Sequence, residues 1–185
     1  MTNAELAILG LGGEKPCHGY EIEQTIEGRT MREWTEIGFS SIYYLLKKLE
    51  SKGLVMGWVQ KAEQGPARVL YFITEKGRLA LQAGVQKALS TPAQPNYPIQ
   101  TGLAYMDWVD TQTALKSLIA YRESLKLKLE RMQNPQAKRA DLPWHLIAQF
   151  EHRAVLIEAE LEWINGVIKK WKTDTKGQGS IKDKS

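Results

Sequence analysis

The chain of 185 residues has little of what builds exported, membrane-spanning or disulfide-linked proteins. Its single cysteine, Cys17, cannot form a disulfide within the chain and fits the reducing cytoplasm. No apolar run reaches the roughly 18 residues that a transmembrane helix needs. Residues 1–5 lack the basic region and the small-residue cleavage site of an export signal. We therefore expect a cytoplasmic protein without a membrane partner.

The motifs of common enzyme, nucleotide and metal sites are also missing. Residues 10–13 look like a nucleotide-binding loop only superficially, because the fingerprint G-x-G-x-x-G would need glycine where Lys15 stands. The histidines are scattered, and no Cys/His pair has the spacing of metal ligands. No base is evident beside Cys17, and no G-x-S-x-G sequence marks a nucleophilic serine. We therefore expect no enzyme activity, no cofactor and no metal.

Charge is almost balanced and informative only locally. The chain has 25 Lys and Arg against 21 Asp and Glu, a net charge of +4. Residues 1–89 carry 11 basic and 10 acidic side chains, so bulk charge does not mark them as a nucleic-acid binder. Within them, residues 38–52 have a local charge of +2, whereas residues 19–36 are acidic.

The uncharged segment from Ser90 to Pro98 contains three prolines and is typical of a linker. We place the linker at residues 90–99. It separates a first domain, residues 1–89, from a helical domain, residues 100–173, and a disordered tail is expected over residues 174–185.

Apolar spacing predicts an order of elements in residues 1–89. Asn3 can cap a first helix that Gly12 and Gly13 end, and after a turn at residues 16–19 a second helix runs to about Gly28. A third helix begins at Ser40 or Ser41, and Gly53 follows its C-terminus. Two β-rich runs, residues 54–59 and 68–73, and a fourth helix over residues 74–89 complete the order. We therefore predict a mainly α fold with a small β-hairpin, a winged helix-turn-helix.

The third helix is the best candidate for reading DNA. Its apolar stripe leaves hydroxyl and lysine side chains on the other face, and a major groove admits one such helix. A solvated surface helix is the competing interpretation. The DNA-facing candidates on this helix are Ser40, Ser41, Tyr43, Tyr44, Lys47 and Lys48.

The hairpin loop is a candidate wing that would lie along the DNA backbone or the adjacent minor groove. Lys61, Gly65 and Arg68 belong to it, and basic side chains there would neutralise phosphates. An ordinary exposed hairpin remains the alternative, which Glu63 favours mildly.

The second half of the sequence is predicted to form two long helices that pack along each other. Apolar residues recur in a heptad pattern in residues 111–133 and again in a helix of up to about 30 residues after Pro143. One small domain cannot cover so long a seam, so we expect the first of these helices and a second copy of the chain to cover it. The predicted dimerisation residues are Leu118, Leu125, Phe150, Ile157, Leu161, Ile164, Ile168 and Trp171.

Tryptophan is unusually common, with six among 16 aromatic residues. We predict Trp58 and Trp34 as packing residues of the first domain. Aromatic rings can sandwich a flat ligand, so Tyr105, Trp108 and Trp163 could line an effector pocket. Simple helix packing is the alternative for these three.

An ordered set of segments strengthens the prediction of a DNA-binding protein. The segments are residues 18–22, 38–50, 52–55 and 71–77. Together they resemble the PadR family of bacterial transcriptional regulators, and the helical half is similar to the longer subgroup with two C-terminal helices. The resemblance implies a homodimeric winged-helix repressor in which Tyr20 joins the third helix at the DNA.

We therefore expect a homodimer that binds double-stranded operator DNA and represses transcription until a small-molecule effector releases it. One alternative is a dimeric winged-helix module that binds protein and not DNA, which the small net charge of residues 1–89 motivates. Another is a constitutive DNA binder without an effector.

Overall fold

The computed structural model describes residues 1–35, 37–38, 41–60, 67–92, 96–133 and 142–178. It divides into two compact units, Met1–Pro95 and Asn96–Ser185, which we describe separately. Within the described residues, no helix combines the length and apolarity needed to span a bilayer.

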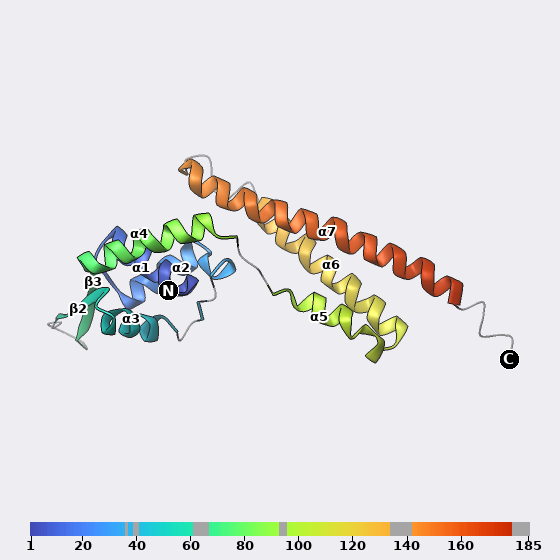
Figure 1. Cartoon of the computed structure of the whole chain (residues 1–185), viewed down its shortest axis with the longest axis horizontal. Coiled ribbons are helices and arrows are strands. Elements are labelled where there is room, and N and C mark those ends of the chain that lie inside the picture. The colour runs from blue at the N-terminus through green and yellow to red at the C-terminus, as the bar shows by residue number, and fades with distance from the viewer. Residues whose placement is uncertain (36, 39–40, 61–66, 93–95, 134–141, 179–185) are drawn as a thin grey trace. The chain divides into compact units, whose positions relative to one another are not determined.

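The first unit has the winged-helix order that the sequence predicts (Figure 1). It adds one short strand, β1, to that order. Its elements are α1 (Asn3–Glu14), β1 (Cys17–His18), α2 (Gly19–Gly28), η1 (Met31–Glu33), α3 (Ser41–Ser51), β2 (Val55–Gln60), β3 (Arg68–Ile73) and α4 (Glu75–Ser90). The strands form one antiparallel sheet in the order β1-β3-β2. The predicted turn at residues 16–19 is thus wrong in part, because Cys17 and His18 pair with Tyr71 and Leu70 of β3.

The N-terminus of α1 differs from the prediction. Thr2, not Asn3, is the N-cap, and its hydroxyl accepts a hydrogen bond from the Glu5 N–H. Asn3 instead donates its side-chain amide to the carbonyl of Trp34, 3.0 Å away. The helix also continues through Gly12 and Gly13 to Glu14, so this glycine pair does not end it.

The predicted stripe of α3 is confirmed and forms the centre of the first unit's core. Its apolar residues Ile42, Leu45, Leu46 and Leu49 are buried with Ile8 and Leu9 of α1 and with Ile22 and Ile26 of α2. Trp34 packs against this core as predicted. Trp58 was predicted as a packing residue too, but 62% of it is exposed. Along β2 the neighbouring Gly57 faces the core, so Trp58 points to the opposite side of the sheet.

The helix ends of the first unit follow the predicted chemistry. Gly53 has a φ of +69°, the left-handed conformation that glycine adopts after a helix without steric cost. Thr74 caps α4 by accepting from the Gly77 N–H at 3.0 Å, while its own hydroxyl donates to the carbonyl of Gly53 at 2.7 Å.

The second unit consists of α5 (Pro98–Ala104), η2 (Met106–Trp108), α6 (Thr111–Gln133) and α7 (Trp144–Gln178). Helices α6 and α7 pack along each other, with Leu118, Leu125, Ile164 and Ile168 buried between them. The helix α5, which the sequence did not predict, begins inside the segment that we assigned to the linker. Helix α7 reaches Gln178, beyond the start of the predicted tail, and residues 179–185 lie outside the described part.

Candidate nucleic-acid interface

One face of α3 is exposed, opposite to its buried stripe. Tyr43 and Tyr44 are 53% and 64% exposed, and Lys47 one turn further is exposed as well. These positions alternate with the buried ones because apolar residues recur every three or four positions along the helix. The predicted separation of an apolar stripe from a hydroxyl-bearing and basic face is therefore present in the structure.

Ser41 begins α3 and closes the turn before it. Its hydroxyl donates to the carbonyl of Gly38 at 2.7 Å. The hydroxyl oxygen keeps lone pairs for further hydrogen bonds. Ser40, the other predicted residue here, lies outside the described residues.

Tyr43 is seated against the N-terminus of α2. A Cβ atom added to Gly19 would lie 2.6 Å from Cε1 of the Tyr43 ring, closer than real contacts allow. The absence of a side chain at Gly19 therefore lets the ring rest on the backbone of α2. This contact sets where Tyr43 lies at the exposed face.

Tyr20 extends this face from α2 toward the sheet. Its ring stacks on His18 with a centroid distance of 5.6 Å, and the guanidinium carbon of Arg68 lies 5.4 Å from the Tyr20 centroid. His18 Nδ1 is 3.0 Å from the carbonyl oxygen of Val69, which can only accept, so Nδ1 carries the proton. The stack links the first turn of α2 to the base of the hairpin.

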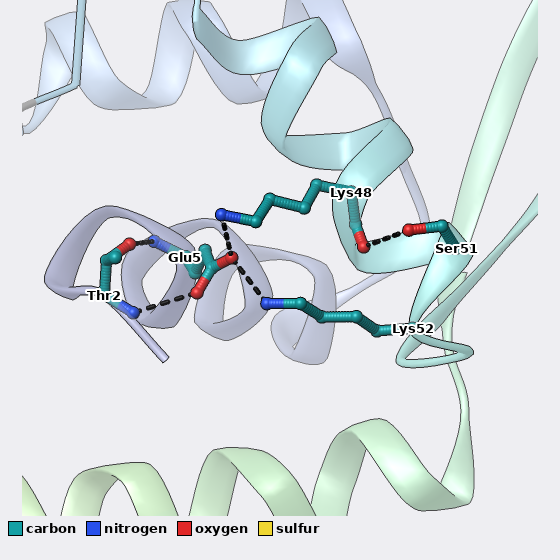
Figure 2. A network of polar contacts seen from close by, with 5 residues as sticks. All are labelled: Thr2, Glu5, Lys48, Ser51 and Lys52. Carbon is teal, nitrogen blue, oxygen red and sulfur yellow. Dashed lines mark hydrogen bonds and ion pairs between the residues drawn. The ribbon is translucent and has the colours of Figure 1, made fainter.

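Lys48 has a different environment from its neighbour Lys47. Glu5 of α1 is 1% exposed, and its Oε1 lies 3.1 Å from Lys48 Nζ and 2.7 Å from Lys52 Nζ. Its other oxygen accepts the backbone N–H of Thr2 at 2.9 Å. Figure 2 shows the two lysines reaching the carboxylate from the same side, with Thr2 on the other.

The electrostatics of this network follow from its geometry. The hydrogen bond from Lys52 lowers the pKa of the Glu5 carboxyl to about 2, with further help from Thr2 and Lys48, although burial opposes the shift. The pKa of Lys48 is raised by its bond to Glu5. The sequence predicts the same DNA-facing role for Lys47 and Lys48, but their environments differ, because the Lys48 ammonium pairs with a carboxylate of its own chain. The DNA-facing role of both stays a prediction.

We name the set of predicted DNA-facing residues that line this face of the first unit the recognition surface. It consists of Tyr20, Ser41, Tyr43, Tyr44, Lys47 and Arg68. Two more predicted DNA-facing residues, Lys61 and Gly65, fall in the wing loop, outside the described residues. No pattern in the sequence pointed to Glu5, because a single glutamate near a helix start is expected for capping alone.

The predicted dimerisation residues lie differently from expectation. Leu118, Leu125, Ile164 and Ile168 are at most 5% exposed, and Ile157 and Leu161 pack against the same cluster. All six therefore make contacts within one chain, and their part in a contact with a second copy stays a prediction. Phe150 and Trp171 are half-buried.

A second apolar set on α7 was missed. Val155, Leu156 and Trp163 are 61%, 47% and 41% exposed. Leu156 and Trp163 are seven residues apart, each one position before a residue of the buried seam, so heptad spacing could have indicated them.

One of the three predicted effector residues lines the cavity that the described residues of the second unit form. Tyr105 lines a cavity of about 900 Å³ in the second unit, whereas Trp108 and Trp163 are not among its lining residues. Trp108 is 87% exposed. The cavity is instead bordered by residues of α5, η2 and the first half of α6.

Comparison with known proteins agrees with the winged-helix geometry. Residues 8–83 match the transcriptional regulator PadR-like family. These residues therefore belong to this family. PadR-like proteins are transcriptional regulators, in agreement with the expectation that this chain is not an enzyme. No curated protein matches the chain significantly.

Solved PadR structures share the fold over nearly the whole chain. Bacillus subtilis PadR in complex with operator DNA is 18% identical, with a TM-score of 0.72 over 91% of this chain and 98% of that one. The same protein in complex with p-coumaric acid is also 18% identical, with a TM-score of 0.71 and the same coverage of both chains. The PadR-like regulator BC1756 from Bacillus cereus is 18% identical, with a TM-score of 0.67 over 92% of this chain and 98% of that one. The PadR-like fold therefore extends through both units.

Proposed function

We propose that this PadR-like regulator is a homodimeric repressor that binds operator DNA through the recognition surface. The observation that carries the proposal is the exposed face of α3, where Tyr43, Tyr44 and Lys47 lie opposite a buried apolar stripe. The complex of Bacillus subtilis PadR with operator DNA supports it.

Each member of the recognition surface has a chemistry suited to DNA. Lys47 is placed to neutralise a phosphate, and the hydroxyls of Ser41, Tyr43 and Tyr44 can bond to phosphate oxygens or base edges. Arg68 at the start of β3 reaches the backbone beside the groove, with its guanidinium oriented by Tyr20. The wing residues Lys61 and Gly65 belong to the same proposal.

A second copy of the chain would pair through α7. Val155, Leu156 and Trp163 provide an apolar stripe outside the chain's own seam. A dimer would present two α3 helices to major grooves about one turn, or roughly 34 Å, apart. Phe150 and Trp171, which are half-buried, complete the proposed dimer contacts.

Release of the operator by a small molecule completes the proposal. A ligand shifts the protein away from DNA only if it binds the non-binding conformation more tightly. The p-coumaric acid complex of Bacillus subtilis PadR supports a ligand-responsive regulator. Of the predicted effector residues Tyr105, Trp108 and Trp163, Tyr105 lines the cavity of the second unit and is the proposed effector contact.

The test is binding to the chain's own promoter region, measured by gel shift and by fluorescence anisotropy over a range of salt. Lys47→Ala should weaken binding and lower the salt slope by about 0.9 for one lost phosphate contact. Lys87→Ala, an exposed lysine of α4 with the same charge change, is the matched control and should leave both unchanged. Equal behaviour of the two variants, or no specific shift of the wild type, would favour a protein-binding module instead.

A further inference from the structure

The residues that line the cavity of the second unit indicate which kind of molecule it can bind. It has a volume of about 900 Å³, within the range of roughly 300–1,000 Å³ typical of small-molecule sites. We name it the tyrosine cavity after three of its lining residues, Tyr97, Tyr105 and Tyr121.

The apolar part of the wall belongs to the packed core of the unit. Leu118 and Ala114 of α6 are 5% and 3% exposed, and Leu103 and Met106 pack against the same cluster. All four line the cavity. Because these side chains are held by the seam between α6 and α7, this part of the wall exists before any ligand binds.

Two hydroxyl groups of the wall, both on α6, already donate to other groups of the protein. The Tyr121 hydroxyl donates a hydrogen bond to the Glu160 carboxylate of α7. Its oxygen can therefore only accept a hydrogen bond from a ligand. Ser117 likewise donates its hydroxyl to the carbonyl of Thr113 at 2.9 Å. Burial and the neighbouring Glu160 raise the pKa of Tyr121, so it stays a neutral phenol at physiological pH.

No residue that the structure places in the cavity wall carries a formal charge. The carboxylate of Glu160 lies directly behind Tyr121. An anionic ligand would therefore lose its hydration without gaining a cationic partner, and it would face a nearby negative charge. A neutral ligand with a donor group meets neither cost.

We propose that the tyrosine cavity binds an uncharged aromatic molecule whose hydroxyl donates to the Tyr121 oxygen. The inference rests on the proposed function only in making this molecule the effector, since binding itself needs no DNA. It replaces Trp108 and Trp163 by Tyr121 as the deciding contact.

The experiment is isothermal titration calorimetry of the full chain with two probes of the same shape. Naphthol is neutral at pH 7, whereas naphthoate is anionic. We expect naphthol to bind and naphthoate to bind at least about tenfold more weakly. Tyr121→Phe, which removes the acceptor oxygen, should lower the affinity for naphthol by about three- to tenfold. Equal affinities of the two probes would overturn the proposal.

A pocket-filling variant locates the site. A Cβ atom added to Gly102, which lines the cavity, would meet nothing within 4 Å, so Gly102→Leu has open space for the start of its side chain at the cavity wall. Gly166→Leu is the matched control, because Gly166 on α7 also has open space and lies outside the cavity. Naphthol affinity should fall at least about tenfold in Gly102→Leu and stay unchanged in Gly166→Leu.

The other outcomes are separable. If wild type does not bind naphthol and Gly102→Leu weakens self-association, the cavity is a contact between two copies and the proposal is wrong. If the proposed function is wrong, Lys47→Ala leaves the affinity for DNA unchanged while naphthol still binds.

Discussion

Two adjacent lysines with the same chemistry lie in different environments in this protein. Lys47 is exposed on the recognition surface, whereas Lys48 lies 3.1 Å from a carboxylate that is 1% exposed. A helical step of about 100° separates neighbouring side chains, so only one of the two can reach α1. A DNA-binding test that changes both lysines together would combine a lost phosphate contact with damage to the core.

Glu5→Gln should destabilise the chain by about 1–3 kcal/mol at pH 7, because the ion pairs to Lys48 and Lys52 lose their negative partner. The folded-state pKa of about 2 lies below the ordinary 4.5, so the stability that the carboxylate contributes is complete above about pH 5. It is lost as the pH falls toward 2. Urea unfolding at several pH values should show the gap between wild type and variant closing with acid.

The control for this prediction is Glu27→Gln, an exposed glutamate of α2. It should change the stability by no more than about 0.5 kcal/mol. A gap for Glu5→Gln that is constant from pH 7 to pH 3 would contradict the role of its charge.

At the scale of elements, α3 is fixed at several points. Glu5 holds its C-terminal half to α1, and the Glu50 carboxylate accepts the N–H of Gly57 in β2 at 2.9 Å. The start of the helix is held by Ser41 and by Tyr43 against Gly19. A helix held in this way presents its exposed face without a large ordering cost on binding.

Thr74→Ala tests the junction at which β3 passes into α4. The hydroxyl both caps α4 at the Gly77 N–H and donates to the carbonyl of Gly53, just after α3. We expect a loss of about 1–2 kcal/mol in the free energy of unfolding, measured with urea. Thr74→Ser keeps the oxygen and should recover most of it. If both variants are equally unstable, the methyl group and not the cap is what matters.

The sequence did not predict the short elements β1 and α5, and the reasons are physical. The two residues of β1 have no periodicity, and they become a strand only because β3 offers hydrogen bonds beside Cys17 and His18. The seven residues of α5 are too few to be stable alone, so packing of Ile99 and Leu103 against the second unit decides their form.

At the scale of the whole molecule, the proposed dimer would form through the apolar stripe of Val155, Leu156 and Trp163 on α7. Leu156→Glu should weaken dimerisation at least about tenfold, because a charged side chain would be buried at the centre of the contact. Sedimentation velocity at micromolar concentration measures it. Leu89→Glu, at an 85% exposed leucine of α4, is the matched control and should sediment as wild type. A monomeric wild type would refute the dimer.

The sequence alone determined the long elements and the PadR-like resemblance. The stripe of α3, the caps at Thr74 and Gly53, and the heptads of α6 and α7 are local patterns that survive any arrangement of the rest. The tertiary structure alone decided which partner each pattern meets. It placed the heptad seam inside one chain, the Lys48 ammonium on Glu5, and Tyr105 and Tyr121 around one cavity. Such pairings join residues far apart in sequence, and periodicity contains no information about them.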